Sequence, residues 1–224
     1  MIVLYRIRSE SPNMRKITLM LEEIGLPYAV KYIEAHDNEQ EHDFEFKKIS
    51  PTGTAPAIVD TDNNVQLFES TAILHYLAEK TGNLLPTGIS GKSQAIKWLA
   101  FEAANICPIM LELHHYIMND SGEYPEEIFQ RYKDKLSQVC SILDKELENS
   151  EYLAGEYSVA DIAIFPWTVT FEDMAEVDLH DFPYLQRWFM KINNRKAAQQ
   201  TTSSELAQSE WCYLNGKIAL CGTN

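Results

Sequence analysis

The stretch TAPAIVDTDNNVQLFESTAILHYL, residues 54–77, decides the predicted fold of this chain. Within it, PAIVD (56–60) and VQLF (65–68) are short apolar segments separated by the polar turn Asp62-Asn63-Asn64, which is typical of a β-hairpin. A helical pattern follows directly over residues 69–80. The stretch therefore predicts two antiparallel strands followed by a helix.

The residues before this stretch predict a strand, a helix and a second strand. IVLY (2–5) and YAVKYI (28–33) have the composition of short strands, and a helix begins at Ser11-Pro12-Asn13. Gly25 followed by Pro27 ends that helix, as is common at helix C-termini. A strand–helix–strand unit implies a parallel, right-handed crossover, so we expect a mixed sheet once the hairpin is added. The polar residues between 34 and 50 predict one or two helical turns.

Strand signals stop after residue 80. Residues 81–89 contain Gly, Asn and Pro without periodicity and indicate a linker. The sequence thus predicts an α/β plus all-α chain, with a mixed-sheet α/β domain over 1–80 and an all-helical bundle with a C-terminal tail over 90–224. Helical patterns of the second domain cover residues 91–119, 126–148, 158–173 and 183–193, and the tail after residue 200 predicts no element.

Composition excludes several classes of function. The chain has 19 basic and 33 acidic residues, a net charge of −14, without a basic cluster that could release phosphate counterions, so we expect no nucleic-acid partner. No apolar run reaches the roughly 20 residues that span a bilayer, so we expect no membrane partner. The apolar stretch at the start of the sequence is too short for a signal peptide, so we expect a cytoplasmic location. Neither a Cys-x-x-Cys pair nor a metal-ligand spacing is present, so we expect no metal. The four cysteines are Cys107, Cys140, Cys212 and Cys221.

Three segments of the N-terminal half can carry chemistry. If the Ala55–Pro56 bond is cis, the Ala55 backbone can pair with an extended peptide, whereas a trans bond would make this an ordinary edge proline. Glu69-Ser70 begins a helix and suits an α-amino acid head group, because the helix N-terminus binds a carboxylate and Glu69 can accept from an ammonium. Ser11 and Asn13 begin the first helix and could donate to a thiolate. For the last two segments, plain helix capping is the alternative.

Ser158-Val159-Ala160-Asp161 is a capping-box pattern in the second half, with Asp in place of the usual Glu. We interpret it as folding information rather than chemistry.

Together, TAPAIVD, FESTAILHYL, the linker, the helical half and SVADIAIFPW resemble the glutathione transferase superfamily over about residues 1–200. The resemblance implies that the domain over 1–80 is thioredoxin-like. ESPNMRKITLMLEEIGLPY and QRYKDKLSQVCSILDKELENSEYLAG are similar to its bacterial and fungal nu class, the disulfide-bond oxidoreductase type. The resemblance implies glutathione as co-substrate, with its cysteine backbone at Ala55 and Pro56, its γ-glutamyl head at Glu69 and Ser70, and its sulfur near Ser11 and Asn13. It places Gln40 or Glu41 near the glycyl end, Arg131 near the ligand, and two copies in a homodimer.

The sequence departs from this pattern at a few positions. Ala55 stands where Val or Ile is usual, and Glu102 and Cys107 replace residues that are often Gln and Gly beside the second-substrate pocket. No cysteine lies near the first helix, so a mixed disulfide on the enzyme is not expected at this site.

The resemblance implies a glutathione-dependent disulfide reductase or peroxidase, in which the bound thiolate attacks a small disulfide or electrophile. Conjugation to an activated halide or epoxide is the commoner superfamily alternative. A non-catalytic binding or interaction module of the same fold is the alternative from another class of function.

Overall fold

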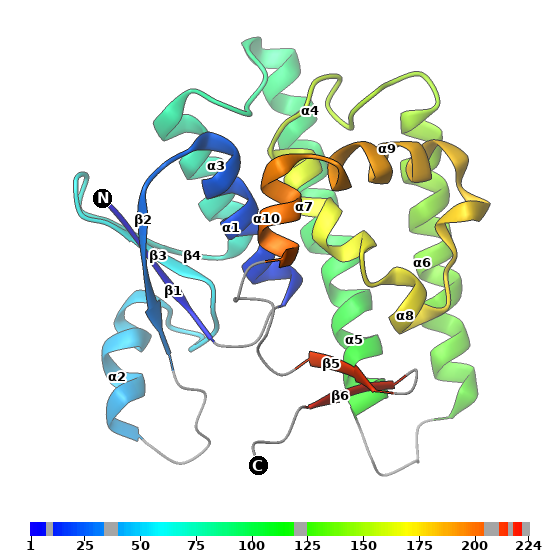
Figure 1. The fold of residues 1–224 in the computed structure, drawn as a ribbon, viewed down its shortest axis with the longest axis horizontal. Coiled ribbons are helices and arrows are strands. Elements are labelled where there is room, and N and C mark those ends of the chain that lie inside the picture. Colours follow the sequence, from blue (N-terminus) through cyan, green and yellow to red (C-terminus); the bar gives the residue numbers. More distant parts are fainter. Residues whose placement is uncertain (8–10, 34–39, 119–124, 204–210, 215–216, 221–224) are drawn as a thin grey trace. The chain divides into compact units, whose positions relative to one another are not determined.

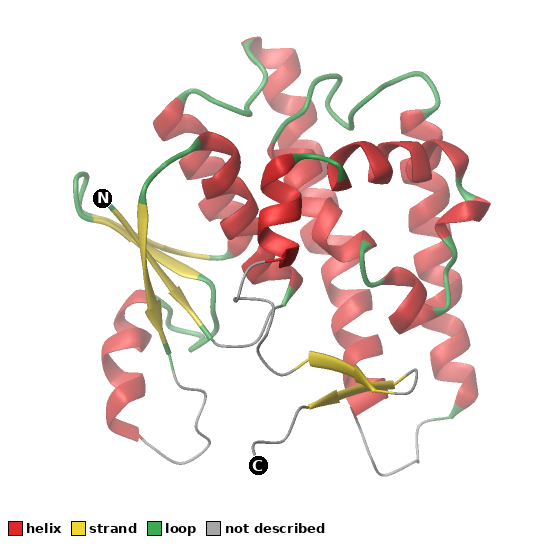
Figure 2. Cartoon of the chain, in the orientation of Figure 1, coloured by secondary structure: helices red, strands yellow, loops and turns green. Residues whose placement is uncertain are grey.

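A computed structural model of the chain describes residues 1–7, 11–33, 40–118, 125–203, 211–214 and 217–220. Contacts divide the chain into two units, one formed by Met1–Thr81 together with Arg195–Asn224 and the other by Gly82–Asn194. The first unit is built on a β-sheet and the second from helices (Figures 1 and 2). The predicted fold class, α/β plus all-α, is confirmed.

The sheet of the first unit has the strand order β2-β1-β3-β4. Strands β1 and β2 are parallel, whereas β3 pairs antiparallel with both β1 and β4, so the predicted mixed sheet is confirmed. Strand β1 alternates between buried and partly buried residues, which is the pattern of a strand with one face packed on a core. The bounds are Ile2–Arg6 for β1, Tyr28–Tyr32 for β2, Ala57–Asp60 for β3 and Val65–Phe68 for β4.

Helices α1 (Pro12–Ile24) and α3 (Ser70–Thr81) pack against each other beside the sheet (Figure 1). Their contact buries apolar side chains of both helices, which form much of the core of this unit: Met14, Ile17, Met20 and Leu21 of α1, and Ile73, Leu74 and Leu77 of α3. Gly25 ends α1 in the left-handed conformation at φ +63°, where a side chain would be strained. The third helix, α2 (Gln40–Ile49), buries Phe46, whose ring stacks on that of Tyr5 with the ring centres 6.0 Å apart.

Asp60 joins the end of β3 to the C-terminal half of α3. Its buried carboxylate accepts hydrogen bonds from the Tyr76 hydroxyl and from Lys80 Nζ, both at 2.6 Å. Burial alone would raise the pKa of Asp60, but these donors, with the Asp62 amide and the Lys80 charge, lower it to about 2. This carboxylate therefore stabilises the end of the sheet opposite to the one where β1 leads into α1.

Helix α10 (Lys196–Ser203) packs on α1 within the first unit. Arg195, just before it, forms a bidentate ion pair with Glu23 of α1, with Nε–Oε1 and Nη2–Oε2 distances of 2.6 and 2.8 Å. We expected the second domain to extend from residue 90 to the C-terminus, whereas contacts group the segment from Arg195 onward with the sheet. The reason is a pairing between residues 172 positions apart, which local patterns do not reveal.

The second unit is helical in its described residues, apart from an isolated β-bridge between Ala154 and Glu156. The expected helix over 91–119 is two α-helical segments joined by one π-helical stretch, η1. The expected helix over 158–173 is broken after Thr168. The elements are α4 (Gly88–Phe101), η1 (Glu102–Ile106), α5 (Cys107–Met118), α6 (Glu126–Leu147), α7 (Val159–Thr168), α8 (Phe171–Ala175), the 3₁₀ turn η2 (Leu179–Asp181) and α9 (Pro183–Asn193).

The predicted capping box at Ser158 and Asp161 is confirmed at the start of α7. Asp161 Oδ2 accepts from the Ser158 amide at 2.9 Å, and Ser158 Oγ accepts from the Ala160 amide at 3.3 Å. Asp161 Oδ1 also accepts from the Leu153 amide at 3.0 Å and from Trp188 Nε1 at 2.7 Å. This fully buried carboxylate thus connects three segments of the second unit.

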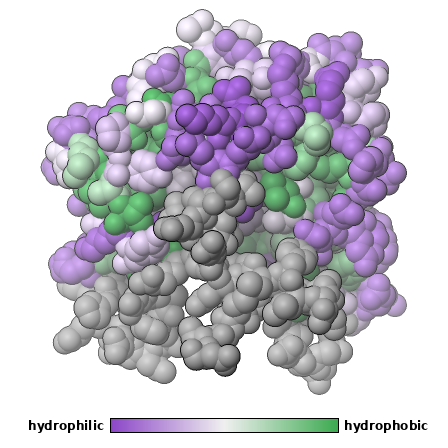
Figure 3. Space-filling model, in the orientation of Figure 1, coloured by the Kyte–Doolittle hydropathy of each residue, from purple (hydrophilic) through white to green (hydrophobic). Residues whose placement is uncertain are grey.

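Two short strands that the sequence did not predict lie in the tail. Strands β5 (Trp211–Leu214) and β6 (Lys217–Leu220) pair antiparallel, with Trp211 opposite Leu220. On the face shown in Figure 3, hydrophilic residues dominate the coloured surface and hydrophobic ones appear in small groups. No helix within the described ranges is both long enough and apolar enough to cross a bilayer.

Candidate functional site

The strand register brings three chain segments to one end of the sheet. Ala57, the first residue of β3, pairs with Tyr5 near the end of β1 and with Phe68 at the end of β4. The chain before β3, the link from β1 to α1 and the start of α3 therefore meet there. The predicted segments Ala55–Pro56, Ser11–Asn13 and Glu69–Ser70 occupy these three positions.

The Ala55–Pro56 peptide bond is cis, which is the condition stated above for Ala55 to pair with an extended peptide. Pro56 is buried and Ala55 is partly exposed. The N–H and C=O of Ala55 find no hydrogen-bond partner among the residues that the structure describes. This backbone can therefore pair with an extended peptide, as a free strand edge does.

The N-terminus of α3 has unused amide donors beside a strained residue. Glu69 has φ +67°, a conformation that non-glycine residues rarely adopt and that often marks functional sites. Its carbonyl accepts from the Ile73 amide at 3.0 Å, and its side chain is exposed. Within the described chain, the amides of Ser70 and Thr71 have no partner. Two free N–H groups at the positive end of a helix suit a carboxylate.

Ser11 caps α1 and keeps a donor. Its backbone is extended at φ −88° and ψ 154°, and its Oγ accepts from the Met14 amide at 3.3 Å. A hydroxyl that accepts in this way still has its own hydrogen to donate. The capping interpretation is therefore correct, and it leaves the thiolate interpretation chemically possible.

Asn13, Ser70 and a residue that the sequence did not predict, Lys16, form one cluster. Lys16 Nζ donates to Asn13 Oδ1 at 2.7 Å and lies 3.4 Å from Ser70 Oγ, which in turn donates to Asn13 Oδ1 at 3.2 Å. The Lys16 side chain is only 1% exposed. A signal for it was present in the sequence, because a residue three positions after Asn13 lies on the same face of a helix.

The other two predicted ligand residues are not part of this cluster. Gln40 is the first residue of α2, and its side chain lies outside the described residues. Glu41 belongs to the same undescribed group of side chains. Arg131 lies on α6 of the second unit, so the structure leaves its predicted proximity to the ligand as a prediction.

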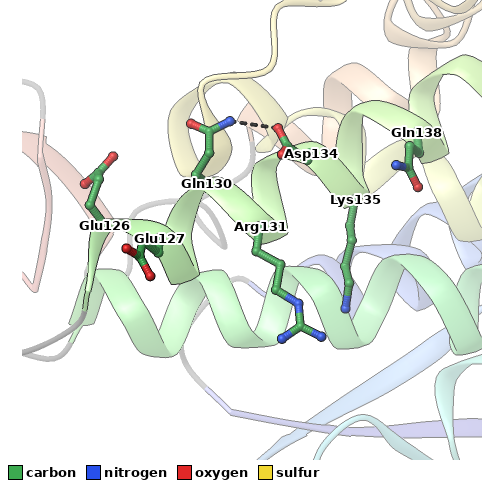
Figure 4. Close-up of a pocket in the computed structure, with 7 residues that line it drawn as sticks. All are labelled: Glu126, Glu127, Gln130, Arg131, Asp134, Lys135 and Gln138. Carbon is green, nitrogen blue, oxygen red and sulfur yellow. Dashed lines mark hydrogen bonds between the residues drawn. The ribbon is translucent and has the colours of Figure 1, made fainter.

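Arg131 lines an open groove along α6 of about 710 Å³. Figure 4 shows the Arg131 and Lys135 side chains extending to the same side of the helix. On another side, Gln130 donates to Asp134 at 2.7 Å. The remaining lining residues are Glu126, Glu127 and Gln138.

Two unusual residues of the helical unit also have defined environments. Glu102 begins the π-helical stretch, is 1% exposed and accepts from Trp167 Nε1 at 2.6 Å. Cys107 follows this stretch at the start of α5 and is partly buried. A π-helical turn inside a helix is often found at a functional position.

Cys140 is a poor candidate for a nucleophile. Burial, with a smaller effect of Asp144, raises the pKa of the Cys140 thiol to about 12, so it stays protonated. Cys212 lies in β5 and Cys221 beyond β6, and both side chains lie outside the described residues. Among the described side chains, no group of three His, Cys, Asp or Glu could hold a metal.

Comparisons with known proteins identify the family that the chain resembles. The models of the glutathione S-transferase N-terminal and C-terminal domains match residues 10–80 and 106–196. The chain is 37% identical over 196 residues to the disulfide-bond oxidoreductase YfcG of Escherichia coli, covering 85% of this chain and 90% of that protein.

Solved structures of bacterial glutathione transferases have the same fold. One from Pseudomonas putida, with one glutathione disulfide bound per subunit, has a TM-score of 0.80 and 32% identity and covers 91% of both chains. One from Burkholderia graminis, with two glutathione molecules bound per subunit, has a TM-score of 0.80 and 33% identity, covering 91% of this chain and 88% of that one.

Proposed function

Because the chain belongs to the glutathione S-transferase family, we propose that it binds glutathione at the sheet end described above and uses the bound thiolate to reduce small disulfides. The observation that carries the proposal is the convergence of the cis Ala55–Pro56 segment, the N-terminus of α3 and the N-terminus of α1 at one end of the sheet.

Each segment matches one part of the glutathione molecule. The free backbone of Ala55 suits the cysteinyl backbone of glutathione, paired as an added strand. The amides of Ser70 and Thr71 suit the γ-glutamyl carboxylate, and the exposed Glu69 carboxylate suits its ammonium group.

The sulfur would then lie near the N-terminus of α1. A free thiol has a pKa near 8.5, so only a few per cent is thiolate at neutral pH. Donors from Ser11 and Asn13, with the helix dipole, would lower this pKa and raise the thiolate fraction.

The reaction needs no cysteine of the protein. The bound thiolate attacks one sulfur of the substrate disulfide, forms a mixed disulfide with it and releases the other half as a thiolate. A second glutathione thiolate then attacks the mixed disulfide, which releases the remaining substrate thiol and glutathione disulfide. The relatives that are named as a disulfide oxidoreductase, or that have glutathione disulfide bound, support this chemistry for the present chain.

The test is glutathione-dependent reduction of a small soluble disulfide by the purified protein. We expect turnover well above the uncatalysed exchange, and a loss of about 100- to 1,000-fold in kcat for Ser11→Ala combined with Asn13→Ala, the range found when a positioned donor to a developing charge is removed. Asn63→Ala is the matched control, since Asn63 lies in the β3–β4 turn and bonds only Asp60 and Tyr76 in the described structure.

Two outcomes would redirect the proposal. Wild-type turnover in the double variant would remove Ser11 and Asn13 from the mechanism. Glutathione binding without reduction of disulfides or peroxides, and without conjugation of an activated halide, would favour the non-catalytic module.

The proposal includes a cytoplasmic homodimer. A reducing compartment supplies the glutathione that this reaction consumes and keeps thiols free. Light scattering on the purified protein tests the dimer, and fractionation of the source cells tests the location.

A further inference from the structure

Lys16 is a buried cation inside the cluster that the predicted site residues form. Its ammonium contacts Asn13 Oδ1 at 2.7 Å and Ser70 Oγ at 3.4 Å, and its side chain is 1% exposed. Burying a lysine costs free energy unless hydrogen bonds compensate it. Asn13 Oδ1 and Ser70 Oγ supply such hydrogen bonds, and they hold the cation between the N-termini of α1 and α3, where the predicted site residues meet.

The helix geometry explains how Lys16 reaches this position. Asn13 and Lys16 are three residues apart and lie on one face of α1. Helical side chains lean toward the N-terminus, so the long lysine side chain returns toward the first turn. Helix α3 packs against α1 and brings Ser70 to the same point.

Lys16 determines which way the Asn13 carboxamide faces. An ammonium group donates and never accepts, so it must contact the amide oxygen. The Ser70 hydroxyl donates to the same oxygen at 3.2 Å. Rotating the amide by half a turn would place its NH₂ group against two donors. Both contacts thus hold the Asn13 amide oxygen toward Lys16 and Ser70, so the amide N–H groups point away from these two residues.

We propose that Lys16 is a positioning residue of the transferase site, which holds the Asn13 amide with its N–H groups directed at the sulfur of bound glutathione. This inference rests on the function proposed above. A cation bound to the amide oxygen also polarises the amide, which makes its N–H groups stronger donors. Lys16 thus stabilises the thiolate through Asn13 without touching it.

The experiment compares the wild-type protein with Lys16→Met, which keeps an unbranched side chain and removes the ammonium. The thiol pKa of bound glutathione is measured from the ultraviolet absorbance of the thiolate during a pH titration, and glutathione affinity is measured by calorimetry. We expect the thiol pKa to rise by about one unit, which is roughly a tenfold lower thiolate fraction at neutral pH. kcat should fall about tenfold at neutral pH and recover as the pH rises, with a smaller change in the KM for glutathione.

Lys80→Met is the matched control, because it removes a lysine of the same unit that pairs with the buried Asp60 at 2.6 Å, away from the cluster. It should lower Tm and leave the thiol pKa and the pH profile unchanged. A purely structural role for Lys16 would give Lys16→Met this same pattern, and that result would overturn the inference.

A second variant covers the case in which Lys16→Met does not fold. Lys16→Gln keeps a neutral donor for Asn13 Oδ1 and should give a thiol pKa between those of wild type and a fully uncoupled site. A wild-type thiol pKa in folded Lys16→Gln would also overturn the inference. If wild-type protein fails to bind glutathione or to lower its thiol pKa, the proposed function falls, and the role of Lys16 falls with it. If the wild type binds glutathione and lowers its thiol pKa, and the Lys16 variants give the same thiol pKa, only the role of Lys16 is ruled out.

Discussion

The N-termini of α7 and α3 both carry a serine, yet the protein uses their amide groups differently. At α7, the Ser158 and Ala160 amides bond the side chains of Asp161 and Ser158, and the Val159 amide bonds the Leu84 carbonyl at 2.8 Å. Every one of these donors is satisfied inside the unit. At a helix start of this kind, the paired polar groups stabilise the folded state.

At α3 the serine side chain turns away from its own helix. Ser70 Oγ bonds Asn13 and Lys16 of α1, and the Ser70 and Thr71 amides have no partner in the described residues. Leaving donors unused beside a residue at φ +67° costs stability. The comparison shows that the same element end can serve folding or binding, according to whether its amides are paired.

The largest expected effect is a loss of stability at the start of α7, where the amides are paired. Asp161→Ala removes the acceptor of the Leu153 amide, the Ser158 amide and Trp188 Nε1, all buried. Each unpaired donor costs about 1–3 kcal/mol, so we expect a loss of at least about 3 kcal/mol in the free energy of unfolding, measured with urea. Glutathione affinity of the folded fraction should stay at the wild-type value, and a drop in that affinity would contradict the division of roles.

The next effect is the pH dependence that Asp161 produces. Burial raises its pKa from 3.8 to about 6, with its hydrogen-bond donors opposing the rise in part. Since the folded pKa exceeds the unfolded one, the contribution of Asp161 is fully present below about pH 3.8 and is lost as the pH rises through about 6. Relative to Asp161→Asn, the wild type should lose about 2 to 2.5 kcal/mol of unfolding free energy between pH 4 and 7. A difference that is flat with pH would show that the carboxylate ionises normally.

A matched pair of substitutions sharpens the comparison directly. Ser158→Ala removes a helix cap and should lower the unfolding free energy by about 1 kcal/mol without changing glutathione binding. Ser70→Ala should weaken glutathione binding about tenfold, or about 1.4 kcal/mol, with a small stability change because Lys16 still bonds Asn13 at 2.7 Å. Calorimetry measures the glutathione affinity of both variants, and urea unfolding measures their stability. If Ser158→Ala lost affinity and Ser70→Ala lost stability instead, the roles given to the two helix starts would be wrong.

The smallest effect is a gain in stability at the binding end. Glu69→Gly relieves the strain at φ +67° and should raise the unfolding free energy by about 1 kcal/mol. It should also weaken glutathione binding, because the carboxylate that suits the ammonium group is lost. Glu69→Gln separates the two terms, since it keeps the strain and removes only the charge. Equal stability of Glu69→Gly and wild type would show that the conformation is not strained.

The sequence alone predicted the elements whose signals are local. Short apolar runs, helical patterns, Gly25 and the capping box at Ser158 identified the order of strands and helices in the first 80 residues, α1 and the start of α7. Each of these signals depends on residues close in the chain. Asn215-Gly216 between two short apolar runs is a hairpin signal of the same kind for β5 and β6, which our prediction of no element after residue 200 missed.

Only the tertiary structure decided which groups meet. The cis state of Ala55–Pro56, the positive φ of Glu69 and the association of α10 with α1 depend on neighbours far along the chain. The same holds for Lys16, whose sequence neighbours describe an ordinary amphipathic helix. Its role as a buried donor follows from α3 bringing Ser70, 54 positions away, to the Asn13 end of α1. Periodicity encodes which face of a helix is apolar, whereas the partner of a polar group is fixed by packing.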